Sequence, residues 1–326
     1  MLNKVSFDWF SFTLKGKSLD KVISDLGLCP DDFEVRGFGR FGYRSMITHI
    51  VYDICIMFDG TDDMGIHVVV SGGSIRFFMN CFMSVNGKKT PFDTYATDIY
   101  DDEFKHFCAY VLKYGSFSRV DVNIDTDIEF MNPYHIRDLA HDGKMISLYR
   151  SWKMYENSDG SGTFYLGKRN SPTFIRIYDK AKEQGDFESV LYRFEVQFNK
   201  AADNFMMNFM EKGLASAFSS FVDRQLRFVS SGDYHESACE EWLSFMDLIV
   251  KSCIVPYTNY IEKKRKTALN SLLHMFTQYG SIIDTFFTDF GDLDDFVEFM
   301  FQCSSAPPDD PTQLYNFVES KGWSMA

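Results

Sequence analysis

The chain has no pair of cysteines in C-x-x-C spacing. Its seven cysteines are scattered, mostly within apolar stretches, at Cys29, Cys55, Cys81, Cys108, Cys239, Cys253 and Cys303. This pattern argues against a zinc module and a disulfide framework, and it indicates free thiols in a reducing compartment. No segment reaches the roughly 18 consecutive apolar residues of a membrane span, and the N-terminus starts directly with an alternating strand pattern. We therefore expect a cytoplasmic protein that does not enter a membrane.

The chain also lacks an excess of positive charge, since its formal net charge is −13. Nucleic-acid-binding proteins usually carry a basic surface, so this value counts against such a partner. However, residues 284–326 hold nine acids and one base, so much of the acidic excess lies at the C-terminal end. Basic residues gather locally at Lys168, Arg169, Arg176, Lys180 and Lys182, and again at Lys263, Lys264, Arg265 and Lys266. Local fields matter more than the total, although the second group fits a solvated helix face equally well.

Aromatic residues are abundant, at 17% of the chain with 34 phenylalanines, and 326 residues suffice for a large core in one or two domains. Strands are expected at 4–14, two within 44–58, 66–70, 119–125, 144–153, 174–180 and 191–198. Helices are expected at 19–26, 74–83, 101–114, 132–141, 201–212, 214–228, 238–252, 257–279, 284–301 and 314–320. Short links between successive strands favour antiparallel pairing. The predicted fold class is α+β, with an antiparallel sheet, helices on one face and a helical C-terminal lobe.

Three segments alternate polar and apolar side chains, which places each set on one face of a strand. They are 119–125 (RVDVNID), 174–180 (FIRIYDK) and 191–198 (LYRFEVQF). On one face they carry Arg119, Asp121, Asn123, Asp125, Phe174, Arg176, Tyr178, Lys180, Leu191, Arg193, Glu195 and Gln197. If the three strands belong to one sheet, its polar face holds a tyrosine surrounded by carboxylates and cations.

This combination suits phosphoryl chemistry. A hard divalent metal prefers carboxylate oxygens, and a cation near the phosphate stabilises developing charge. Arg176 and Lys180 lie two positions either side of Tyr178. A phenol has a pKa of about 10, so that pKa must fall, or the proton must be removed, before Tyr178 attacks. The candidate metal ligands are Asp121, Asp125 and Glu195. The same pattern is also typical of a solvated sheet face with a packing tyrosine, so residue pattern alone leaves both interpretations open.

The order of several motifs resembles the Rep_trans type of replication initiation factor. The motifs are GYRSM at 42–46, HVVVSGG at 67–73 followed by Arg76, RVDVNID at 119–125, TFYLGKRNSPTFIRIYDKAKEQ at 163–184 and YRFEVQF at 192–198. The IRIYDK block with RFE some fifteen residues on is the most specific part. The resemblance extends from about residue 5 to residue 300. It implies a rolling-circle replication initiator that nicks origin DNA, single-stranded or extruded as a hairpin, and becomes joined to the 5′ phosphate.

By this resemblance Tyr178 is the nucleophile, and Asp121, Asp125 and Glu195 hold Mg²⁺ or Mn²⁺. The chain has no His-x-His pair of the kind found in the wider class of tyrosine nickases, which agrees with a carboxylate site. His67 stays open as a ligand or a packed histidine, and Tyr165 is a rival nucleophile.

The implied partners are a host helicase, a host DNA polymerase and a second copy of the chain. We expect a nicking domain at 1–199, with an N-terminal part at 1–114 and a catalytic part at 115–199, followed by a mainly helical region at 200–326. Two alternative functions remain: a conjugative relaxase with the same chemistry, and a catalytically silent DNA-binding regulatory protein.

Overall fold

The computed structural model describes residues 2–61, 63–86, 101–233 and 235–252. The chain divides into two compact units, Met1–Thr258 and Asn259–Ala326. The second unit lies outside the described residues, as do Lys263 to Lys266 and the helices expected beyond residue 252. The strands of the first unit's main sheet are β1 (Val5–Leu14), β2 (Phe33–Arg36), β3 (Ser45–His49), β4 (Ile54–Phe58), β5 (Ile66–Ser71), β6 (Gly115–Thr126), β8 (Trp152–Glu156), β9 (Gly162–Leu166), β10 (Thr173–Asp179) and β11 (Tyr192–Phe198).

These strands form one ten-stranded sheet in the order β2-β3-β4-β5-β1-β6-β11-β10-β9-β8. All of its strand pairs are antiparallel, as the short links predicted. The order has two similar halves. Each half consists of one central strand, β1 or β6, and a four-stranded antiparallel meander that ends beside it. The two central strands pair with each other and join the halves.

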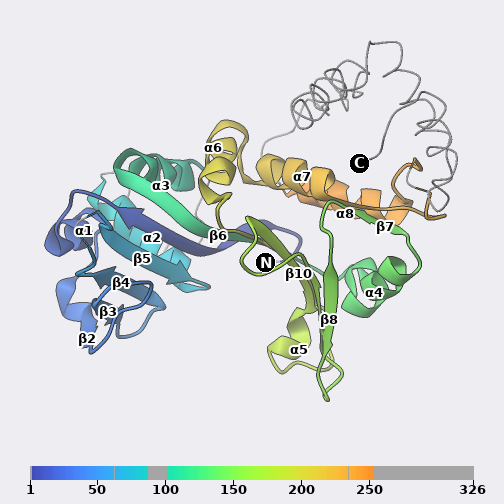
Figure 1. Ribbon diagram of the computed structural model, residues 1–326, viewed down its shortest axis with the longest axis horizontal. Coiled ribbons are helices and arrows are strands. Elements are labelled where there is room, and N and C mark those ends of the chain that lie inside the picture. Colours follow the sequence, from blue (N-terminus) through green and yellow to red (C-terminus); the bar gives the residue numbers. More distant parts are fainter. Residues whose placement is uncertain (1, 62, 87–100, 234, 253–326) are drawn as a thin grey trace, which may run out of the picture. The chain divides into compact units, whose positions relative to one another are not determined.

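Helices cover the apolar face of the sheet. The helices are α1 (Leu19–Asp25), α2 (Ser74–Val85), α3 (Asp101–Tyr114), α4 (Pro133–His141), α5 (Lys180–Glu183), α6 (Ala202–Lys212), α7 (Leu214–Gln225) and α8 (Glu240–Lys251). Helices α2, α3, α6 and α7 contact the central strands or β5, while α4 contacts β9 and β10. Figure 1 shows α3 alongside β6. The α+β architecture expected from the sequence is confirmed.

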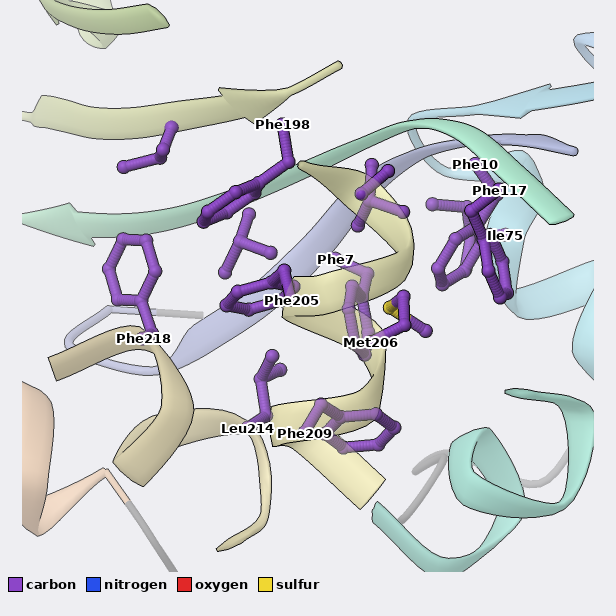
Figure 2. Packing of buried hydrophobic residues seen from close by; sticks show 14 of the residues in the cluster. Phe7, Phe10, Ile75, Phe117, Phe198, Phe205, Met206, Phe209, Leu214 and Phe218 are labelled. Carbon is purple, nitrogen blue, oxygen red and sulfur yellow. The ribbon is translucent and has the colours of Figure 1, made fainter. Parts of the chain in front are cut away.

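Phenylalanine dominates the core between sheet and helices. Phe198 at the end of β11 stacks on Phe205 of α6 with ring centroids 4.0 Å apart, and Phe7 of β1 meets Phe209 of α6 edge-on at 5.3 Å. Figure 2 shows these rings meeting between the strands and α6. Aromatic pairs in such geometries stabilise a core beyond their buried area. Helix α6 is thereby part of the same core as the sheet.

Two local differences from the predicted elements concern strand 144–153 and helix 214–228. The first is divided into β7 (Met145–Ser147) and β8, and the second ends at Gln225, before β12 (Leu226–Phe228). β7 and β12 pair as a separate two-stranded sheet. This pairing joins segments about 80 residues apart, and periodicity within one segment carries no information about such a partner. β2 was also not predicted, because its four residues are too few to show a period.

Free cysteines are spread over the described part of the chain. Cys29, Cys55, Cys81, Cys108 and Cys239 are free thiols. Burial raises the pKa of Cys108 to about 12 and that of Cys81 to about 11, so both stay protonated at neutral pH. Within the same residues no helix has the length and apolarity needed to cross a membrane.

Candidate active site

The strand register aligns the polar residues in two rows across one face of the sheet. The first row is Asp125, Arg193, Tyr178 and Thr163, and the second is Asn123, Glu195, Arg176 and Tyr165. Asp121 and Gln197 pair with each other two residues further along β6 and β11. The three alternating strands are therefore neighbours, and their polar side chains share a face.

Arg176 connects two of the predicted metal-side carboxylates. Its guanidinium contacts Glu195 Oε1 and lies 3.1 Å from Asp121 Oδ2. Asp121 and Glu195 are only 1% and 2% exposed, so their charges depend on this partner. Asp121 also receives two hydrogen bonds from Arg119, from Nε at 2.8 Å and from Nη2 at 2.5 Å. The structure thus brings Asp121 and Glu195 together around a cationic group.

The Tyr178 hydroxyl donates a hydrogen bond to Glu195 Oε2 at 3.3 Å. Burial, followed by the nearby Glu195 charge, raises the pKa of Tyr178 above its usual value of 10, although Arg193 and Arg176 oppose that shift. Burial also raises the pKa of Glu195 to about 7, against the lowering effect of Arg176 and with a further rise from Asp121. The phenol is therefore neutral at rest, and it contacts a carboxyl group that can exchange a proton near neutral pH.

Asp125 is held by Arg193, not by the arginine that holds Asp121 and Glu195. Its two carboxylate oxygens accept hydrogen bonds from Arg193 Nε at 2.5 Å and Nη2 at 2.8 Å, and Arg193 also reaches Asp8 at 3.2 Å. Arg193 lies directly opposite Tyr178 in the strand register. Asp125 thus fixes a cation beside the tyrosine, and a direct metal contact through Asp125 would require Arg193 to release it.

Lys180 does not lie on the strand, which corrects the expected placement. Strand β10 ends at Asp179, whose carboxylate accepts a hydrogen bond from Lys182 N at 3.0 Å and caps the short helix α5. Lys180 is the first residue of α5, and its ammonium pairs with Glu183. The ammonium still lies 5.8 Å from the centre of the Tyr178 ring. Lys180 is therefore near the tyrosine but is not part of the strand that carries Arg176 and Tyr178.

Tyr165 and His67 have surroundings that favour packing roles. Tyr165 stacks on Phe174 with centroids 5.3 Å apart and meets Tyr155 edge-on at the same separation. Both ring nitrogens of His67 are engaged, Nε2 with Ser11 at 2.9 Å and Nδ1 with Thr13 at 2.8 Å. Neither nitrogen is therefore available to a metal without breaking a hydrogen bond.

The oxygen donors on this face fit a hard divalent cation by type. Mg²⁺ is commonly bound by one or two carboxylates together with water and substrate phosphate, and Asp121 and Glu195 form such a pair. Gln197 Oε1 and Arg176 Nε are buried and lack a hydrogen-bond partner among the described residues. Over the same residues no group of three or more histidine, cysteine, aspartate or glutamate side chains is arranged to hold a metal. The two carboxylates that lie together on this face are those of Asp121 and Glu195, which share Arg176.

Sequence reasoning passed over Arg193, Arg119 and Gln197 as site residues. All three follow the alternation that identified Asp121 and Glu195, each two positions away from one of them. That spacing was a usable signal, because residues two apart on a strand share a face. The specific pairing of each arginine with its carboxylate depends on the strand register, which the spacing does not give.

Comparisons with known proteins point in one direction. The family model for replication initiation factors, Rep_trans, matches residues 115–298. No curated protein matches the chain. Among solved structures, a rolling circle replication initiator protein from Geobacillus stearothermophilus is 22% identical with a TM-score of 0.63, and the match covers 76% of this chain and 96% of that chain. At this identity the likeness to the solved structure is one of fold.

Proposed function

The chain belongs to the replication initiation factor family, and from this premise we propose that it is a rolling-circle initiator that nicks one strand of its origin DNA. The observation that carries the proposal is the hydrogen bond from the Tyr178 hydroxyl to Glu195, beside an arginine that spans two buried carboxylates. A nucleophile, a proton acceptor and a cation are the groups that a phosphodiester transesterification needs.

In the proposed reaction the Tyr178 oxygen attacks the scissile phosphorus. A bond forms between that oxygen and phosphorus, and the bond from phosphorus to the 3′ oxygen breaks. The DNA 5′ phosphate is then joined to the tyrosine, and the 3′ oxygen takes up a proton to leave a free hydroxyl. Because one phosphodiester replaces another, the reverse attack by a 3′ hydroxyl can rejoin the strand at the same site.

Glu195 is proposed to accept the phenol proton. The raised pKa of Tyr178 makes a free phenolate rare, so proton removal has to accompany attack rather than precede it. A carboxyl whose pKa is about 7 is half ionised at neutral pH and becomes a sufficient base once the phenol oxygen begins to bond to phosphorus. The contact of 3.3 Å is within reach of that transfer after a small approach.

Cationic side chains are proposed to balance the charge of the phosphate. Arg176 lies between Asp121 and Glu195, and Arg193 faces Tyr178 from the neighbouring strand. Lys180 contributes from the start of α5. Guanidinium groups held by carboxylates keep fixed positions, so little reorganisation is needed when the phosphate arrives.

Asp121 and Glu195 are the proposed ligands for Mg²⁺ or Mn²⁺, which when bound would polarise the phosphate. Asp125 remains a proposed metal ligand, and it could bind the metal only after its ion pair with Arg193 opens. A host DNA polymerase could extend the free 3′ hydroxyl while a host helicase unwinds the duplex; both are proposed partners. Formation of a homodimer remains a prediction from the family resemblance.

The test is nicking of supercoiled DNA from the chain's own replicon in the presence of Mn²⁺. The wild type should convert it to the relaxed form, Tyr178→Phe should not, and Tyr165→Phe, the matched control on the neighbouring strand, should retain activity. Binding without nicking by the wild type, on DNA that contains the origin, would instead support the silent regulatory protein.

A further inference from the structure

The connection between β2 and β3 exposes two phenylalanines in a basic, glycine-rich segment. We call residues 37–44, with the sequence GFGRFGYR, the aromatic loop. Phe38 is 68% exposed and Phe41 is 73% exposed, whereas most other phenylalanines among the described residues are buried. Single exposed apolar residues are common on surfaces, but two rings this close in sequence on one loop call for a reason.

The backbone of the aromatic loop makes Phe41 an unusual residue for its position. Tyr43 N donates to the Arg40 carbonyl at 3.0 Å, and the two central residues have positive φ, 54° at Phe41 and 89° at Gly42. These are the features of a type I′ turn, which favours Asn-Gly at its centre. A bulky residue in the left-handed region is strained. Asparagine would suit this turn better, so the turn itself does not account for the phenylalanine.

Phe41 nevertheless has a defined position. Its ring meets the His67 ring edge-on at 5.7 Å, and Tyr43 lies over the same histidine at 6.0 Å. His67 is fixed by Ser11 and Thr13 of β1. One side of the Phe41 ring therefore rests on a rigid support, while most of its surface remains accessible.

Positive charge accompanies the two rings. Arg40 lies between them in sequence and is exposed, and over the described residues its guanidinium forms no hydrogen bond or ion pair. Arg36 precedes the loop and pairs with Glu34 at 3.6 Å, and Arg44 is the last residue of the loop and pairs with Asp59 at 2.9 Å. Exposed aromatic rings alternating with cations form the surface that binds single-stranded nucleic acid, because bases stack on the rings while the cations contact phosphates.

The aromatic loop also lies on the same face of the sheet as the candidate active site. His67 beneath Phe41 belongs to β5, which is four strands away from β10. Across the sheet this separation is about 19 Å, at about 4.8 Å per strand. Along the strands it is about 30 Å, because His67 pairs with Thr13 near the end of β1, whereas the row of Tyr178 reaches Asp125 of β6, next to the Val5–Ile124 pair at the start of β1. The two sites are therefore about 35 Å apart. Between them Arg119 lies over Trp9, 4.2 Å from its ring centre, and holds Asp121. A single DNA strand of several nucleotides can span that distance.

We propose that the aromatic loop is a stacking site for unpaired bases of the DNA strand that Tyr178 cuts, with Phe41 and Phe38 as the platforms and Arg40 as the phosphate contact. This inference rests on the proposed function for the identity of the strand. It assigns strand binding to the first half of the sheet, away from the nucleophile.

The test measures fluorescence anisotropy of a labelled oligonucleotide of about twenty nucleotides, single-stranded or as a duplex. All proteins carry Tyr178→Phe so that the DNA stays intact. Phe41→Asn removes the ring but suits the turn, so it should weaken single-strand binding about fivefold or more while the melting temperature stays equal or rises. Met207→Ala, at a 51% exposed side chain of α6, is the control and should change neither.

The duplex should be much less affected than the single strand, because its bases are already stacked. Unchanged single-strand affinity in Phe41→Asn, or an equal loss on duplex, would overturn the proposal. The nicking assay separates this proposal from the proposed function. If the wild type nicks DNA but Phe41→Asn binds the single strand normally, only the role of the aromatic loop is refuted. If Phe41→Asn binds more weakly but the wild type does not nick DNA, only the nicking activity is refuted.

Discussion

Glu195 is the residue on which the proposed chemistry depends most, because it touches both the nucleophile and Arg176. Asp121 touches the same arginine but not the tyrosine. Two carboxylates that share one guanidinium can therefore differ in role: both are proposed ligands of the metal, but only Glu195 is placed to accept the phenol proton. The charges nearly balance on this face, where Arg119, Arg176 and Arg193 meet Asp121, Asp125 and Glu195.

The two carboxylates should fail in different ways when neutralised. Asp121→Asn should raise the Mn²⁺ concentration needed for half-maximal nicking by about tenfold or more, because a ligand is weakened. Glu195→Gln should lower the rate by about a hundredfold or more even at saturating Mn²⁺, because the proton acceptor is lost. Single-turnover nicking over a Mn²⁺ titration measures both quantities.

The control is Glu183→Gln on α5, which removes an exposed carboxylate near Lys180. Asn123→Asp is not suitable as a control, because it would add a charge beside Glu195. Glu183→Gln should leave the Mn²⁺ midpoint unchanged. If saturating Mn²⁺ restores full activity to Glu195→Gln, Glu195 is a ligand and not the base.

At the scale of the elements, alternation in the sequence predicted the strands and their polar faces well. The faces of β6, β10 and β11 follow directly from a period of two. The pairing of β6 with β11 does not follow from a short link, because the two strands are far apart in sequence. Lys180 shows where this reasoning ends, since the Asp179 cap stops the strand one residue earlier. The pairing of Arg193 with Asp125 depends on register between strands 68 residues apart, and no local pattern encodes it.

His67 gives a prediction about the β1–β5 pair. Burial lowers its pKa from 6.5 to about 4, so between these values the unfolded chain binds more protons than the folded one. The free energy of unfolding should therefore fall as pH drops through this window, by about 3 kcal/mol in full, and the contribution is intact above pH 6.5. Urea unfolding at pH values above and within the window measures this loss.

His67→Gln serves as the control because glutamine can still both donate and accept toward Ser11 and Thr13 but does not titrate. Its stability should depend less steeply on pH than that of the wild type. Carboxylates titrate in both proteins, so the difference between the two curves isolates His67. Parallel curves would contradict the assignment.

For the whole molecule, the two similar halves of the sheet carry different surfaces. In the second half, the face opposite the helices holds the ion-paired polar rows. In the first half, the corresponding face is covered by a small hydrophobic cluster of Tyr43, Met46, Met57 and Val69, against which Trp9 packs. One half therefore has the residues for chemistry, and the other has the aromatic loop and its support.

The predicted boundary at residue 199 can be tested through the shared core. A chain ending at Asn199 would expose Phe198, which stacks on Phe205, and Phe194, which meets Phe218 and Phe245. We expect this truncated chain to aggregate or to lack a cooperative thermal transition, because it leaves large aromatic rings in water. A chain that continues through α8 to Thr258 should unfold cooperatively. Cooperative unfolding of the 1–199 chain would show that the helices are dispensable.

The most direct test of the central claim is identification of the residue joined to DNA. The protein is incubated with its origin DNA and Mn²⁺, digested with trypsin, and the DNA-linked peptide is sequenced by mass spectrometry. Cleavage after Lys168 and Arg176 separates Tyr165 from Tyr178. An adduct on Tyr178, absent in Tyr178→Phe, is the predicted result. An adduct on Tyr165, or nicking that persists in Tyr178→Phe, would contradict the account.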